Sequence, residues 1–208
     1  MYRRRGISAR TASRTRHAGT AAKCAVPLLA AAMPRAVWLL ADTPALTEAG
    51  LLPGEDVHKH LTGCEQAILL AVTLAPVDAQ IRRAGVGDIA AGVASDALGS
   101  ALAEQAADAA EAQLRQWAAT EGKYLTGRFS PGYGDWDIAV QPLVAAALDT
   151  VRKAGLCVTD TNLMTPRKSV TALLGVSDHP VKGQLGRVRP LCAAHPLRIQ
   201  KEGKDLCK

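Results

Sequence analysis

Hydrophobic positions along this chain follow helical spacing in some segments and form continuous apolar runs in others. Acidic side chains beginning at Glu55 favour the first turn of a helix, and Gly63 is placed to end it. The apolar run AILLAVTL, residues 67–74, contains β-branched members and predicts a buried strand. Helical patterns follow over residues 76–84 and 88–117, and the longer one is rich in Ala, Glu, Gln and Leu.

The pattern after residue 141 predicts one more helix and then further strands. Pro142 lacks a backbone donor and fits a helix first turn, and Gly155 ends that helix. The residues expected on its buried side are Leu143, Val144, Leu148 and Val151. Residues 156–178 predict two or three strands with TPRK as a turn. Separated strands and helices of this kind predict an α+β fold, with an antiparallel or mixed sheet and flanking helices.

The segments differ in how clearly they predict structure. Residues 1–50 give the weakest pattern and are expected to form a basic, poorly ordered extension. The core is expected over residues 51–180, with a tail at 181–208. The first 20 residues resemble a transit peptide because they hold six arginines and no acidic residue, although a disordered arm gives the same composition.

Charge and cysteine content narrow the class of protein. Of the 25 Lys and Arg residues, six lie in residues 1–20, which leaves 19 to balance the 19 acidic residues of the remaining chain. A neutral body lacks the basic face that nucleic acid requires, so no nucleic-acid partner is expected. No apolar run reaches the roughly 18–20 residues that span a bilayer, so no membrane partner is expected. Five irregularly spaced cysteines argue against a disulfide scaffold and favour a reducing compartment, the cytoplasm.

The loop GRFSPGYGDWDIAVQ, residues 127–141, differs in composition from the rest of the chain. Five of the seven aromatic residues fall between Trp117 and Trp136, among glycines and a proline that favour turns. Arg128 offers a planar guanidinium that suits a carboxylate, and glycines allow backbone to approach a ligand. The aromatic rings suit a heterocycle or a sulfonium cation. Two interpretations remain open at this point, a packed turn of the core and a site for a flat ligand that carries a carboxylate.

The segment from Arg128 to Tyr133 has the form R-x-x-x-G-Y, and it resembles the S-adenosylmethionine-binding motif of the activation domain of cobalamin-dependent methionine synthase. VTDTNLMTPRKSVTALLGVSD, residues 158–178, resembles a later segment of that domain, including its Met-x-Pro turn. Residues 55–74 and 80–88 resemble the short, free-standing members of the family. The resemblance covers about residues 50–180 in consistent order.

This resemblance implies a function in the reactivation of cobalamin for methionine biosynthesis. In the full enzyme, cob(I)alamin is occasionally oxidised to cob(II)alamin; the activation domain then presents S-adenosylmethionine, and an electron from flavodoxin or another low-potential reductant allows methyl transfer to cobalt. By match to the motif, Arg128 would hold the ligand's carboxylate, Pro131 and Gly132 would line its adenosine, and Tyr133 would close the site. The cobalamin modules are missing from this sequence, so it would act in trans on a cobalamin-binding methionine synthase or corrinoid protein and be inactive alone.

Residues facing the partner are expected in the LMTPRK turn, namely Met164, Pro166 and Arg167. No side chain is expected to be catalytic. The large enzyme also has a tyrosine pair that touches the ligand, where this chain has Lys182 and Gly183, so the ligand would be held by fewer groups or by different ones.

The tail contains Cys192, His195 and Cys207, of which the first two have a C-x-x-H spacing. Three ligands are one short of a closed tetrahedral zinc site, so these are weak metal candidates and a tail with reduced thiols is expected. Two other functions remain as alternatives: a regulatory module that binds S-adenosylmethionine without methyl transfer, and a helical interaction protein.

Overall fold

The computed structural model describes residues 23–181 and 198–202. The chain divides into two compact units, which are 1–32 with 76–102, and 33–75 with 103–208. The long helix α5 (Ile89–Thr120) contributes residues to both units.

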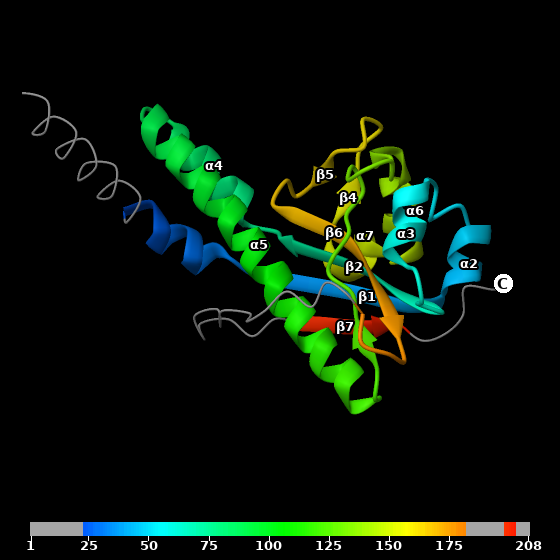
Figure 1. Ribbon diagram of the computed structural model, residues 1–208. Helices are drawn as coiled ribbons and strands as arrows, with labels where there is room; N and C mark the ends of the chain where they lie inside the picture. The colour runs from blue at the N-terminus through cyan, green and yellow to red at the C-terminus, as the bar shows by residue number, and fades with distance from the viewer. Residues whose placement is uncertain (1–22, 182–197, 203–208) are drawn as a thin grey trace, which may run out of the picture. The chain divides into compact units, whose positions relative to one another are not determined.

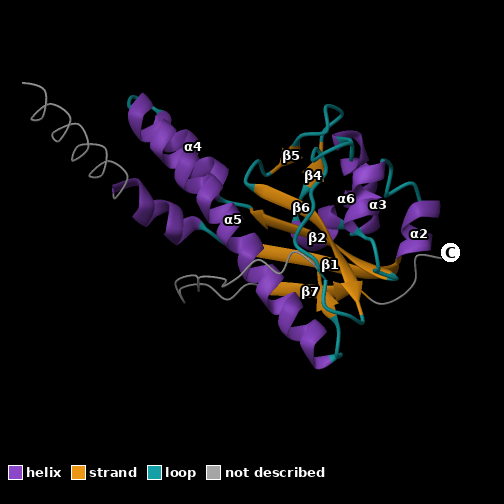
Figure 2. Ribbon diagram, in the orientation of Figure 1, coloured by secondary structure: helices purple, strands orange, loops and turns teal. Residues whose placement is uncertain are grey.

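The larger unit is built on a five-stranded sheet in the order β3-β6-β2-β1-β7 (Figure 2). Its strands are β1 (Pro34–Asp42), β2 (Gln66–Leu74), β3 (Tyr124–Leu125), β6 (Ser169–Ser177) and β7 (Arg198–Glu202). Neighbouring strands are antiparallel except for β7, which pairs with β1 in parallel. The predicted α+β class, with a mixed sheet and flanking helices, is confirmed, and a wholly helical interaction protein does not fit this sheet.

Strand β1 corrects the expectation that residues 1–50 form a poorly ordered extension. Val37 and Leu39 of this strand are buried in the main hydrophobic core, and the strand pairs with β2 along its whole length. The expected tail at 181–208 likewise contains β7. The sheet therefore recruits residues from both sides of the predicted 51–180 core.

Two layers of helix cover the sheet of this unit (Figure 1). On one face lie α2 (Thr43–Glu48), α3 (Glu55–His60), the 3₁₀ helix η1 (Ile138–Val140), α6 (Gln141–Ala147) and α7 (Thr150–Ala154). Leu69, Val57 and Val144 belong to the core cluster between these helices and the strands. Side chains alternate along a strand, so Trp38 points to the other face, where its ring centroid lies 4.9 Å from that of Trp117 in α5.

The predicted helix after Pro142 is divided in two, and half of its expected buried residues are exposed. Asp149 adopts a left-handed conformation with φ of 48°, which ends α6 and turns the chain into α7. A break of this kind rotates Val151 out of the helical register on which the expectation rested. Leu143 precedes the break, and as the direct neighbour of buried Val144 it lies on a different side of α6. The expectation holds for Val144 and Leu148, which are buried, and it is wrong for Leu143 and Val151, which are exposed.

The predicted strands of residues 156–178 are present as β6 and as a short hairpin of β4 (Cys157–Val158) and β5 (Met164–Thr165). The hairpin forms its own two-stranded sheet. Phe129 makes an isolated bridge to Leu173 of β6. Strand β6 therefore positions the start of the aromatic loop.

The described part of the smaller unit is helical. It contains a helix over residues 23–31, α4 (Val77–Gly85) and the first part of α5. The Asp88 carboxylate, just before α5, accepts a hydrogen bond from the Ala91 amide in the first turn of that helix. A Cβ at Gly92 would lie only 2.9 Å from the Cα of Gly85, so α4 and α5 approach closely where side chains are absent. Among the described residues, no helix is both long and apolar enough to cross a membrane.

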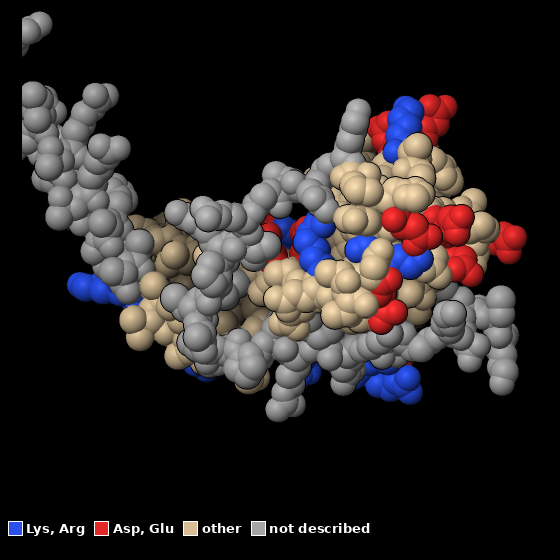
Figure 3. Space-filling model, turned by 60° about the horizontal axis from the view of Figure 1, so that its bottom comes forward, with Lys and Arg blue, Asp and Glu red and all other residues tan. Residues whose placement is uncertain are grey.

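Charge is mixed on the face drawn in Figure 3, where Lys and Arg side chains lie among Asp and Glu side chains. Ion pairs between such groups include Lys59 with Glu55 and Arg152 with Asp149. The face drawn there does not form a continuous basic surface.

Candidate functional site

The aromatic loop, defined here as residues 127–137, leaves the sheet beside β6. The Phe129 amide donates to the Leu173 carbonyl at 2.9 Å, and the Leu173 amide donates back at 2.7 Å. These two bonds fix the backbone on either side of Arg128 and Ser130. The start of the loop therefore pairs with β6 as a neighbouring strand would, although its sequence favours turns.

The middle of the loop is a tight turn that needs glycine. Gly132 has φ of 94°, and its amide donates to the Trp136 carbonyl at 2.7 Å. The Tyr133 amide donates to the Ser130 carbonyl at 3.1 Å, which closes a second turn that precedes and overlaps the first. Residues other than glycine are strained at such φ values. Gly132 and Tyr133 are exposed at the tip of this turn, whereas Pro131 is buried.

The far end of the loop is fixed to the start of helix α3 by Asp135. Its carboxylate accepts hydrogen bonds from the amides of Glu55 at 2.6 Å and Asp56 at 2.9 Å. These backbone donors, the Asp56 amide first, hold the pKa of the Asp135 carboxyl below its ordinary value. Gly54 is required beside it, because a Cβ there would lie 2.5 Å from Asp135 Oδ1.

His60 supports the loop from α3. Its Nε2 lies 3.0 Å from the Gly127 carbonyl oxygen and 2.9 Å from Thr126 Oγ1, and its ring stacks on Phe129 with centroids 5.0 Å apart. Burial lowers the pKa of His60, and the bond to the Gly127 carbonyl opposes that effect. A neutral ring that donates from Nε2 to Gly127 satisfies this geometry.

We expect His60→Gln to flatten the pH dependence of stability in the acidic range. Since burial lowers the folded-state pKa of His60 below its ordinary value of 6.5, the unfolded chain takes up a proton first as pH falls. The stability that neutral His60 contributes is complete above 6.5 and declines as pH falls from there toward the folded-state pKa. Thermal melts between about pH 7.5 and about pH 5 should lose more stability in the wild type than in the variant. Equal losses would contradict the buried, neutral state of this ring.

The aromatic rings of the loop are mostly packed against one another. Trp136 is fully buried, donates from Nε1 to the Leu51 carbonyl at 3.1 Å, and stacks on Phe129 with centroids 5.8 Å apart. Phe129 is covered by His60 on one side and touched at its edge by Tyr133. The packed-turn interpretation therefore holds for Phe129 and Trp136. Of the three rings of this loop, that of Tyr133 is the most exposed, at 60%.

Arg128 lies in a cluster of acidic side chains from α5. Its Nη2 lies 2.5 Å from Asp108 and 3.6 Å from Glu104, and its Nε lies 3.0 Å from Glu111. Glu111 also pairs with Arg115 at 2.6 Å, and Arg115 donates to two loop-proximal carbonyls. In the part of the chain that the structure describes, Arg128 Nη1 is buried and has no hydrogen-bond partner.

The sequence alone did not point to the acidic residues around Arg128. Glu104, Asp108 and Glu111 are four and three residues apart, which places them on one face of a helix. That spacing predicts a row of acidic side chains along one side of the helix. The sequence did not predict that these acidic side chains pair with Arg128, because Arg128 is brought to them by the long-range pairing of the loop with β6.

The predicted partner-facing residues lie on the β4–β5 hairpin and the turn after it. Met164 is half-buried and packs against the main core, Pro166 follows a cis peptide bond, and Arg167 is exposed. Of the three, Arg167 offers the most side chain to solvent.

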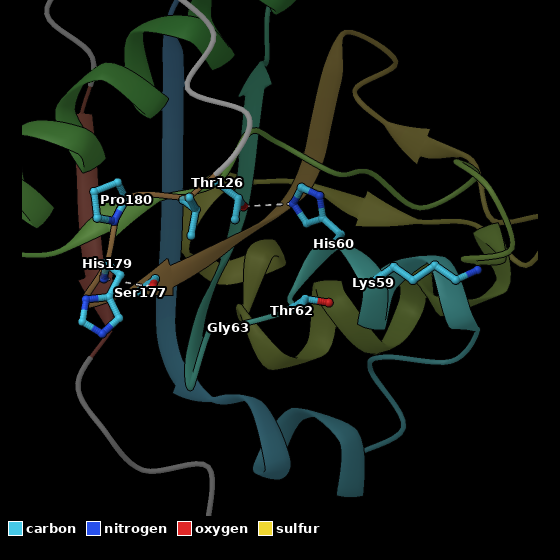
Figure 4. Close-up of a pocket in the computed structure, with 9 residues that line it drawn as sticks. Lys59, His60, Thr62, Gly63, Thr126, Ser177, His179 and Pro180 are labelled. Atoms are coloured by element: carbon cyan, nitrogen blue, oxygen red, sulfur yellow. Dashed lines mark hydrogen bonds between the residues drawn. The ribbon is translucent and has the colours of Figure 1, made fainter.

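A pocket of about 400 Å³ opens beside His60, between the end of α3 and the end of β6 (Figure 4). His60, Thr126, Ser177 and His179 are among its lining residues. The Thr126 hydroxyl already accepts from the Gly175 amide at 2.8 Å, and the Ser177 hydroxyl accepts from the His179 amide at 3.1 Å. Both hydroxyl groups are therefore already engaged with nearby backbone amides.

The metal candidates Cys192, His195 and Cys207 lie outside the described residues. Within residues 23–181 and 198–202, no three His, Cys, Asp or Glu side chains are grouped as a metal site would require. Cys24, Cys64 and Cys157 are free thiols, and burial raises the pKa of Cys64.

Comparison with known proteins gives a partial similarity to a solved structure. No protein-family profile matches the chain, and no curated protein sequence matches it. Among solved structures, the chain is similar to the crystal structure of the MetH reactivation domain bound to AdoHcy, with a TM-score of 0.49 and 21% sequence identity. The similarity covers 61% of this chain and 43% of that one, so this chain spans less than half of it. The function proposed for this chain therefore rests on its own residues.

Proposed function

We propose that this protein binds S-adenosylmethionine at the aromatic loop and supports reductive methylation of cobalamin on a partner protein. The R-x-x-x-G-Y motif from Arg128 to Tyr133 supports this, together with the other segments that resemble a methionine synthase activation domain in the same order. The structure adds that this motif is anchored by β6 at one end and by α3 at the other. A site held at both ends needs little ordering when a ligand binds.

The observation that carries the proposal is the state of Arg128. Its guanidinium is largely buried, with 18% of the side chain exposed, yet Nη1 has no partner among the described residues. A buried donor without an acceptor is costly, and a ligand carboxylate would satisfy it. Four residues later, Gly132 presents exposed backbone without a side chain. This arrangement fits a ligand that has a carboxylate at one end and a flat base at the other.

The roles of the loop residues follow from this fit. Arg128 would hold the carboxylate, and the backbone at Pro131 and Gly132 would line the adenosine. Tyr133 is 60% exposed and would close over the ligand. Phe129 and Trp136 are packed together, so they would support the site from below rather than stack on the base.

When bound, S-adenosylmethionine supplies an electrophilic methyl group on sulfonium. The imidazole that contacts the loop, His60, has its Nε2 engaged with Thr126 and Gly127, so it is not placed as a base or nucleophile. We therefore place the acceptor on a partner, as the cobalt of a reduced corrinoid. The partner would be a cobalamin-binding methionine synthase or a corrinoid protein that contacts Met164, Pro166 and Arg167. Flavodoxin or another low-potential reductant would supply the electron in the cytoplasm.

The test of this function is the visible spectrum of a corrinoid protein over time. We expect no consumption of S-adenosylmethionine by the protein alone. With a cob(II)alamin-loaded corrinoid protein and a low-potential reductant, methylcobalamin should accumulate only when this protein is present. If S-adenosylmethionine binds but several corrinoid proteins stay in the cob(II)alamin form, the ligand serves regulation and the methyl-transfer proposal is wrong.

A further inference from the structure

The cluster around Arg128 holds more negative than positive charge. Three carboxylates, from Glu104, Asp108 and Glu111, face the guanidinium groups of Arg128 and Arg115. A ligand carboxylate would add a further negative charge to this cluster. Arg128 Nη1 has no partner among the described residues, but a carboxylate that binds the guanidinium with both oxygens also needs Nη2. Asp108 and Glu104 already face Nη2, so such a ligand must displace a carboxylate from it.

The exposure of the three acids distinguishes them. The Glu111 side chain is 13% exposed and pairs with both Arg115 and Arg128, so it fixes the cluster. Glu104 is 65% exposed and lies 3.6 Å from Arg128, which makes it the more distant partner. Asp108 is 49% exposed and sits 2.5 Å from Nη2. It is therefore the carboxylate that is both closest to Arg128 and free to swing into water.

We infer that Asp108 occupies the position of the ligand's carboxylate on Arg128 and competes with it. This inference rests on the proposed function and assigns a residue that sets the affinity of the site. In the free protein Asp108 pairs with Nη2. On binding it gives up Nη2 and moves into solvent, and the ligand's carboxylate takes Nη1 and Nη2 together. Because Glu111 stays on Nε, the arginine keeps its position through the exchange.

Removing the competing charge should therefore tighten binding. In a calorimetric titration with S-adenosylmethionine, Asp108→Asn should bind about two- to fivefold more tightly than wild type, the range expected for a half-exposed ion pair. Decarboxylated S-adenosylmethionine is the second probe, since it lacks the group for which Asp108 competes. Its affinity should be the same for wild type and Asp108→Asn.

Glu121→Gln is the matched control, because Glu121 is exposed just after α5 and its loss changes the net charge equally. It should bind both probes like the wild type. Unchanged or weaker binding of S-adenosylmethionine by Asp108→Asn overturns this inference, as does an equal gain for the decarboxylated probe. In those cases wild-type binding still upholds the proposed function, whereas no binding by wild type overturns both.

Discussion

Replacing Trp136 by alanine should lower the free energy of unfolding by about 3–5 kcal/mol, the usual cost of removing a large buried aromatic side chain. Trp136 is fully buried in the main core and stacks on Phe129. Its indole also satisfies the Leu51 carbonyl, which the variant would leave without this donor. Loss of that buried partner contributes to the cost of the substitution.

Urea denaturation followed by circular dichroism measures this effect. Tyr133→Ala is the matched control, because Tyr133 belongs to the same loop but is 60% exposed. Its cost should stay below about 1 kcal/mol. Trp136→Phe should fall between the two, since it keeps most of the apolar volume but loses the hydrogen bond to Leu51. Similar losses for Trp136→Ala and Tyr133→Ala would show that Trp136 is not the anchor of the loop.

The sequence predicted those elements that carry their own local signal. The continuous apolar run at 67–74 identified β2, and the glycines and charges around residues 55–63 identified α3. β1 was missed because its apolar residues follow an Ala- and Pro-containing segment without clear periodicity. Its strand conformation depends on pairing with β2 and β7, which no local pattern encodes.

The site was predictable as a loop but not in its packing. The composition of residues 127–141 predicted a loop, and Gly132 occupies a turn for which its φ of 94° is needed. The sequence did not reveal that Phe129 and Trp136 face each other. That contact depends on β6 holding one end of the loop and α3 the other, over separations of 44 and 79–80 residues.

Arg128→Ala should weaken S-adenosylmethionine binding by about ten- to a hundredfold, which corresponds to the roughly 1.5–3 kcal/mol of a charge-assisted hydrogen bond. The guanidinium is the group proposed to hold the ligand's carboxylate, and it is fixed by Glu111 at 3.0 Å. Among the described residues, Arg115 also pairs with Glu111 through its Nε, but its Nη1 and Nη2 donate to the carbonyls of Leu125 and Thr126. Arg115 is therefore not placed to substitute for Arg128.

The control for this variant is Arg152→Ala. Arg152 is 80% exposed on α7 and pairs with Asp149, so its loss removes an equal charge and an ion pair away from the loop. Its affinity for S-adenosylmethionine should equal that of wild type. A comparable loss in both variants would point to a general effect of net charge.

The titration of the full chain with S-adenosylmethionine in a calorimeter tests the central claim most directly. Saturable binding by wild type and Arg152→Ala, weakened about ten- to a hundredfold in Arg128→Ala, is the result expected of a carboxylate held by Arg128. Absence of binding by the wild-type chain would contradict the proposed function. Equal binding by wild type and Arg128→Ala would contradict the placement of the site at the aromatic loop.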